Sequence, residues 1–367
     1  MIGWKKACVF FTVMLLSAGL AAGCGGRRQE PDGNRTEDHV QAEGSKEKLK
    51  VVTTLFPYYD FTRQIAGDKV ELTLVVPAGM DSHSFEPTPA DMRTIQEADI
   101  LICNGGAMEQ WVSQVTEALD TSHMTVVTMM EYVDAVEEEI VEGMEDEAHE
   151  HGHKEIHLDD LDGGNGYGQE SSEHDSHEEH SHEEHSHGEE HEYDEHIWTS
   201  PVNAMKFTQV ITDVLVQADP ENRQLYEAGR DGYLKKLEEV HQMLLQVARD
   251  RKRNTIVVGD KFPFRYLAEE YGFQYRAAFS GCSTDTEPSA RTIAYLIDKV
   301  REENIPAVYY LELSSHRVSE IIGEETGAEP MLLHSCHNVT RREFDAGITY
   351  VDLMLQNVEN LRKGLDE

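Results

Sequence analysis

Residues 70–103 read VELTLVVPAGMDSHSFEPTPADMRTIQEADILIC, and they carry the clearest fold signal in the chain. The pattern predicts a strand over 70–76, then a loop punctuated by proline and glycine. A helix is expected to begin at Thr88 or Pro89, and a second strand covers 99–103. Strands that alternate with helices build parallel sheets, so this stretch predicts an α/β fold.

The same alternation extends along the rest of the chain. Further strands are predicted over 49–55, 125–127, 255–258, 273–279, 307–311 and 331–333, and helices over 57–67, 109–119, 200–216, 289–303, 315–326 and 344–365. In between, a long helical stretch has an apolar stripe formed by Leu225, Tyr233, Leu237, Val240, Leu244 and Val247. Thirty helical residues span about 45 Å, enough to bridge two lobes. We expect an N-terminal lobe over 49–218, a linking helix over 219–253 and a C-terminal lobe over 254–367.

The N-terminus is a targeting segment. Lys5 and Lys6 precede a short apolar run that ends in Leu-Ala-Ala-Gly-Cys24, which resembles a bacterial lipoprotein processing site. We expect residues 1–24 to be the signal peptide, Cys24 to carry a lipid anchor, and 25–48 to form a polar tether. The alternative is plain secretion with Cys24 unmodified.

A histidine- and acid-rich insertion over 137–195 interrupts the fold pattern. The chain has a formal net charge of −38, and 24 acidic residues against Lys154 alone place −23 of it in this insertion. That balance argues against nucleic acid as a partner. Too few apolar side chains are present to offset the entropy of ordering, so we expect a mobile loop.

The insertion is expected to contact metal ions. Eleven of the nineteen histidines lie between His149 and His191, and imidazoles with carboxylates are ligands that Zn²⁺, Ni²⁺ and Cu²⁺ accept. The accessory metal contacts we expect are His149, His151, His153, His174, His177, His180, His182, His185, His187 and His191. The alternative is that the insertion is a solvated acidic linker whose histidines occur by chance.

Two motifs outside the insertion connect the chain to a known family. His83 lies in DSHSFEPTP (81–89) and His196 in DEHIWTSP (194–201). Further matches are Leu55-Phe56-Pro57, NGGAMEQW (104–111), Tyr271-Gly272, Glu287-Pro-Ser289, and Tyr350 with Asn357. Together they resemble the solute-binding proteins of zinc and manganese ABC importers. The resemblance implies two α/β lobes, each a mostly parallel sheet flanked by helices, joined by one long helix, with metal in the cleft between them.

Carried over residue by residue, the resemblance assigns His83 and His196 as metal ligands of the first lobe. Where the family has a third histidine, this chain has Lys261, which has no lone pair to offer, with Asp260 beside it. The family's last aspartate is in register with His334, in the sequence Leu333-His-Ser-Cys-His337. We therefore expect His83, His196, His334 and Asp260 as ligands; Cys336, His337, Glu312 or water are the alternatives for the fourth. Three imidazoles with one oxygen favour zinc over manganese.

Two cysteines follow predicted strands of the second lobe, Cys282 and Cys336. Exported proteins often oxidise such pairs, so we expect a disulfide between them. One alternative is that both cysteines bind zinc as thiolates, and another is that they are two buried thiols without a functional role.

The function implied is capture of zinc outside the cytoplasm and delivery to an ABC permease. We expect a monomer without enzymatic activity, lipid-anchored on the outer face of the bacterial cytoplasmic membrane or periplasmic, whose histidine-rich loop gathers zinc. One alternative is a surface adhesin or zinc-buffering lipoprotein. Another is a secreted zinc hydrolase, which rests on His187-Gly-Glu-Glu-His191, a match expected by chance in a tract of His and Glu.

Overall fold

The computed structural model describes residues 47–144, 193–283 and 287–366. The N-terminal sheet has the strand order β2-β1-β3-β4, and all its pairs are parallel. Its strands are β1 (Leu49–Thr53), β2 (Val70–Leu74), β3 (Ile100–Cys103) and β4 (Thr125–Thr128), flanked by α1 (Phe56–Ala66), α2 (Pro89–Gln96) and α3 (Gln110–Ala118). Strand β3 is buried along its whole length, which explains its unbroken apolar sequence.

The C-terminal sheet repeats this design with the order β6-β5-β7-β8, again all parallel. Its strands are β5 (Thr255–Phe262), β6 (Gln274–Ser280), β7 (Ala307–Tyr310) and β8 (Glu329–Leu332), with helices α6 (Arg265–Tyr271), α7 (Ala290–Glu303) and α8 (Arg317–Thr326). The predicted α/β fold of two parallel lobes is confirmed.

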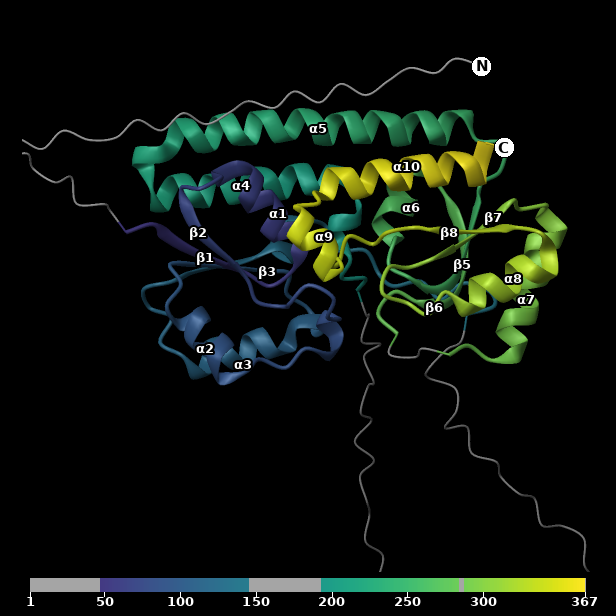
Figure 1. Ribbon diagram of the computed structural model, residues 1–367, viewed down its shortest axis with the longest axis horizontal. Coiled ribbons are helices and arrows are strands. Elements are labelled where there is room, and N and C mark those ends of the chain that lie inside the picture. Colours follow the sequence, from purple (N-terminus) through teal and green to yellow (C-terminus); the bar gives the residue numbers. More distant parts are fainter. Residues whose placement is uncertain (1–46, 145–192, 284–286, 367) are drawn as a thin grey trace, which may run out of the picture. The chain divides into compact units, whose positions relative to one another are not determined.

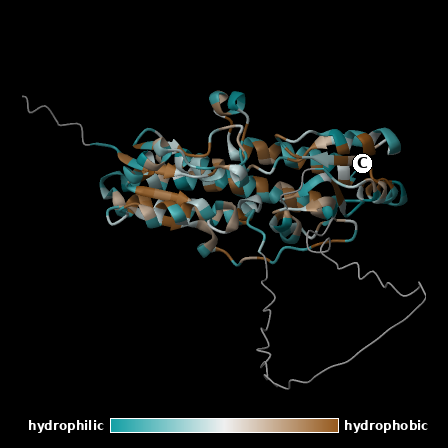
Figure 2. Cartoon of the chain, turned by 90° about the horizontal axis from the view of Figure 1, so that it is seen from below, coloured by the Kyte–Doolittle hydropathy of each residue, from teal (hydrophilic) through white to brown (hydrophobic). Residues whose placement is uncertain are grey.

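A layer of long helices joins the two sheets (Figure 1). Helix α5 (Arg223–Asp250) has 28 residues, a length of about 42 Å, and packs on α4 (Pro201–Ala218), α1 and α10 (Tyr350–Asp366). Its buried residues are Tyr226, Tyr233, Leu237, Val240, Leu244 and Val247. Figure 2 shows helices that alternate hydrophobic and hydrophilic residues, as expected where one face meets a core. The predicted linking helix is confirmed.

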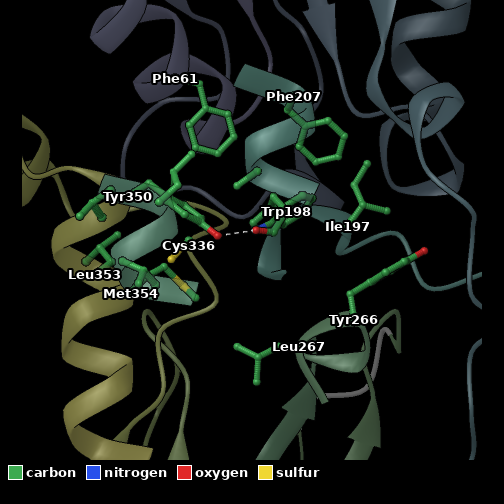
Figure 3. Close-up of a cluster of buried hydrophobic side chains, with 14 of the residues drawn as sticks. Phe61, Ile197, Trp198, Phe207, Tyr266, Leu267, Cys336, Tyr350, Leu353 and Met354 are labelled. Carbon is green, nitrogen blue, oxygen red and sulfur yellow. Dashed lines mark hydrogen bonds between the residues drawn. The ribbon is translucent and has the colours of Figure 1, made fainter. Parts of the chain in front are cut away.

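The lobes share a buried core beneath this helix layer. Figure 3 shows side chains from both lobes gathered around Trp198 and Tyr350. The Tyr350 hydroxyl donates to the Trp198 carbonyl at 2.7 Å. The buried Asp60 carboxylate accepts from the Tyr350 N–H at 2.8 Å and from the Tyr233 hydroxyl at 3.0 Å, so it links α1, α5 and α10. These contacts fix how the loops of the two lobes face each other.

Several sequence predictions of local structure are corrected. The last helix, expected over 344–365, is two helices, α9 (Arg341–Ala346) and α10, because Gly347 adopts φ 74° and ends the first. Leu225 is 38% exposed, and Tyr226 takes the buried position in α5 instead. Helix α6 was not expected from the sequence.

The insertion predicted over 137–195 is too long at both ends. Glu137 and Tyr193 form an antiparallel bridge, and the Asp194 N–H donates to the Val136 carbonyl at 2.9 Å. Asp194 and Glu195 are buried. The ten histidines expected to contact metal in the insertion lie outside the described residues, as do the predicted signal peptide, Cys24 and most of the tether. Within the described ranges, none of the helices has the length and apolar composition needed to cross a membrane.

Candidate metal centre

His83 and His196 both lie on short turns that begin with an aspartate. The Asp81 carboxylate accepts the backbone N–H of His83 at 3.1 Å, and the Asp194 carboxylate accepts that of His196 at 2.8 Å. An aspartate that binds the N–H two residues onward favours a tight turn. His83 thus lies in a single turn of 3-10 helix between β2 and α2, and His196 directly before another.

A third imidazole, His337, joins them from the loop after β8. The ring centroids are 6.0 Å apart for His83 and His196, 5.7 Å for His83 and His337, and 6.2 Å for His196 and His337. All three rings line one pocket of about 420 Å³, together with Asp81, Asp260, Lys261 and residues 311–315. The pocket therefore has walls from both lobes.

Asp194 holds the ring of His196 in place. The Asp194 carboxylate lies 3.2 Å from Nδ1 of His196, and a carboxylate in this position fixes the orientation of an imidazole ring. Burial alone would lower the pKa of His196, but the charge and hydrogen bond of Asp194, with a smaller contribution from Cys282, outweigh it and raise the pKa to about 10. In the metal-free protein His196 is therefore an imidazolium at neutral pH.

The other two imidazoles are neutral at that pH. Burial, followed by the charge of His196, lowers the pKa of His83 to about 4. Burial, followed by the charges of His83 and His196, lowers the pKa of His337 well below its usual value. Neutral rings offer lone pairs, so His83 and His337 are ready to bind a metal ion.

Asp81 adds a carboxylate to this group. One carboxylate oxygen of Asp81 and one ring nitrogen each of His83 and His337 all lie within 4.8 Å of one another. Ligand atoms around a tetrahedral zinc are about 3.3 Å apart, so a group within 4.8 Å is of the size that can share one metal ion. Asp260 also lines the pocket, and its carboxylate accepts the backbone N–H of Lys261 at 2.8 Å.

The structure does not bring His334, the third ligand expected from the sequence, into this group. His334 is buried, Nδ1 of its ring accepts the Cys336 N–H at 2.9 Å, and its side chain is not among those lining the pocket. Cys336 has φ 60°, a left-handed conformation that turns the chain between the two histidines. His337 takes the place beside His83 and His196 because of this turn.

Residues from three separate segments of the chain hold the loop that carries His337. The Asn357 side chain in α10 bonds the backbone N–H and carbonyl of His334, each at 2.7 Å. The Glu312 carboxylate accepts the Ser335 N–H at 2.8 Å. The Trp198 indole N–H donates to the Ser335 carbonyl at 2.8 Å, and its ring stacks on His337 at 5.3 Å between centroids. Trp198 thereby connects the His196 turn of one lobe to the His337 loop of the other.

The expected disulfide is wrong, because Cys282 and Cys336 are both free. The Cys336 thiol is fully buried in the shared core and contacts the His334 carbonyl at 3.7 Å. The Cys282 thiol instead interacts with the His196 side chain, while its backbone N–H donates to Glu138 at 2.9 Å. The two thiols therefore have different neighbours.

Sequence reasoning missed Asp81, Asp194 and Trp198, and it gave His337 only as an alternative. A repeated pattern would have helped: Asp81, Asp194 and Ser335 each precede a ring of the group by two residues and accept its backbone N–H. An acceptor at that spacing marks a turn that projects a side chain.

Two parallel α/β lobes, one long connecting helix and imidazoles contributed from both sides of the intervening pocket define a two-lobed metal-binding protein. Residues 51–364 match the family described as ZnuA, zinc-uptake complex component A, periplasmic, and the chain belongs to this family. The resemblance inferred from the histidine motifs is thus confirmed.

Individual relatives agree with this assignment. The chain is 32% identical over 324 residues to the high-affinity zinc uptake system protein ZnuA of Bacillus subtilis, covering 88% of this chain and 90% of that protein. It is 29% identical over 327 residues to the zinc-binding lipoprotein AdcA of Streptococcus pneumoniae, covering 89% of this chain but 57% of AdcA.

Solved structures show the same architecture. The metal-dependent lipoprotein YcdH from Bacillus subtilis has a TM-score of 0.66 and 29% identity, covering 87% of this chain and 100% of YcdH. The Zn(II)-bound ZnuA-like domain of Streptococcus pneumoniae AdcA has a TM-score of 0.65 and 26% identity, covering 87% of this chain and 100% of that domain.

Proposed function

We propose that this protein is the extracytoplasmic zinc-binding component of an ABC importer, and that it passes its cargo to a membrane permease. The observation that carries the proposal is the meeting of His83, His196 and His337 in one pocket lined by both lobes. The family and the zinc-binding relatives support zinc as the cargo. Membership of this transport family also argues against an enzyme.

The ligand set proposed is His83, His196 and His337 with the Asp81 carboxylate. Three imidazoles with one oxygen suit tetrahedral zinc, whereas manganese favours more oxygen ligands. Asp260 is the alternative carboxylate, since it lines the same pocket. Because the ligands come from both lobes, a bound ion would hold the lobes together in the shape that the permease recognises.

The remaining features of the proposal concern residues outside the described ranges. Cys24 would carry the lipid anchor, with the following polar residues as tether, and the protein would act as a monomer. The histidines of the insertion would gather zinc through weak, rapidly exchanging sites. Their position supports this, because the insertion ends at Tyr193, three residues before His196.

Calorimetric titration of zinc into the full chain tests the ligand set, using His337→Asn and His334→Asn as a matched pair. Asparagine at 334 keeps an acceptor for the Cys336 N–H, whereas at 337 it removes an imidazole from the pocket. We expect one tight site in the wild type and the His334 variant, and its loss in the His337 variant and in His83→Ala. His123→Ala, an exposed histidine beside Gln96, is the control.

Loss of the tight site in His334→Asn with retention in His337→Asn would contradict the ligand set and restore the order expected from the sequence. A tight site that survives every one of these substitutions would contradict the proposed cleft site itself.

A further inference from the structure

Lys261 occupies an unusual place in the metal pocket, created by an irregularity in β5. This strand pairs with β6 in register up to Val258, and the register shifts before pairing resumes at Lys261. Such a bulge re-aims the side chains next to it. Gly259 allows helix α8 to approach this strand closely, since a Cβ at this position would lie 2.5 Å from the Ser319 hydroxyl. As a result Asp260 and Lys261 both line the pocket.

The ammonium of Lys261 has no ion-pair partner among residues 47–144, 193–283 and 287–366, although four acidic residues line the same pocket: Asp81, Asp260, Glu287 and Glu312. Lys261 therefore places an unpaired positive charge in the pocket that His83, His196 and His337 also line. A positive charge beside these rings disfavours a divalent cation bound to them.

We propose that Lys261 is the affinity-determining residue of this site: its ammonium opposes the bound ion and speeds the ion's release. This inference rests on the proposed function, since it requires metal at His83, His196 and His337. A unit charge in a partly buried pocket repels a divalent ion strongly enough to weaken binding by about tenfold or more. For a delivery protein the consequence is useful, because the ion must leave the site at the permease.

The electrostatic origin distinguishes this role from two others. If Lys261 acted through size, a long uncharged side chain would reproduce its effect. If its amine bound the metal, or held an anion that does so, removing it would weaken binding. Repulsion predicts the opposite sign, and nearly the same factor for zinc and cobalt, because both ions carry the same charge.

The test uses the full chain with Lys261→Gln and Lys261→Met, and Lys261→Arg as the control that keeps the charge. Each protein is loaded with one equivalent of zinc or cobalt. Affinity is then measured by competition with a chelator, and the dissociation rate by mixing with excess chelator. The same measurement on His83→Ala gives the background from the histidine-rich insertion.

We expect both uncharged variants to bind each metal at least tenfold more tightly and to release it correspondingly more slowly. The arginine variant should stay within about threefold of the wild type. Unchanged or weaker binding in both Lys261→Gln and Lys261→Met, with a normal wild-type site, would overturn this inference alone. A wild-type protein whose tight binding does not depend on His83 would instead overturn the proposed function.

Discussion

Replacing Asp194 by asparagine should change the number of protons released when zinc binds. Asp194 holds the pKa of His196 at about 10 against the opposing effect of burial. At pH 8 about 99% of a group with that pKa is protonated, and zinc must displace the proton to reach the ring. Removing a proton two pH units below the pKa costs about 3 kcal/mol. His83 and His337, with lowered pKa values, release none.

The wild type should therefore release about one proton per zinc at pH 8, and its affinity should rise about tenfold per pH unit between pH 7 and 9. In Asp194→Asn the charge of the carboxylate is gone and Cys282 is the neighbour that still opposes burial, so the pKa of His196 should fall and clearly less than one proton should be released. The affinity of this variant should depend less steeply on pH in the same range.

The assay is calorimetric titration of the first zinc equivalent in buffers with different ionisation enthalpies, where the slope of the observed heat gives the proton count. The difference between the two proteins isolates His196. Equal proton release from both would refute the role assigned to Asp194.

Three further changes test the packing around the site. Burial raises the pKa of Glu109 to about 7, despite two backbone N–H bonds, so wild-type stability should fall by about 3 kcal/mol as pH rises from 4.5 to above 7. Glu109→Gln should lack this slope in urea unfolding at several pH values, and parallel curves would contradict the assignment. Trp198→Phe leaves the Ser335 carbonyl without its indole donor and should cost about 1–3 kcal/mol in urea unfolding while speeding zinc release into a chelator. Leu237→Ala, in the buried face of α5, should cost about 2–5 kcal/mol in the same unfolding assay but leave zinc affinity unchanged; weaker binding would show that α5 packing tunes the site.

The site shows where prediction from sequence reached its limit. His83 and His196 were found because each lies in a distinctive motif, and the structure brings both rings together. HSCH offers two histidines, and counting along the chain cannot tell which one a turn directs into the pocket; the structure places His337 there, whereas His334 is the residue expected from the sequence. The left-handed Cys336 decides that, and a non-glycine residue with this conformation has little signal in the sequence. The predicted disulfide was wrong for a related reason, because a position directly after a strand does not specify which way the thiol of a cysteine points.

The sequence alone determined the order and type of most elements, the parallel α/β class and the long helix. This was possible because the positions that are buried in a helix or strand recur at a fixed spacing and are occupied by apolar residues. It also determined the family, because the residues of each motif lie within a few positions of one another along the chain. Only the tertiary structure decided that His337 joins His83 and His196, that Asp194 controls the ring of His196, and that Lys261 enters the pocket beside them. Apart from Asp194 and His196, these relations join residues 65 to 254 positions apart. They depend on turns and bulges whose direction is set by the packing of two lobes rather than by local preference.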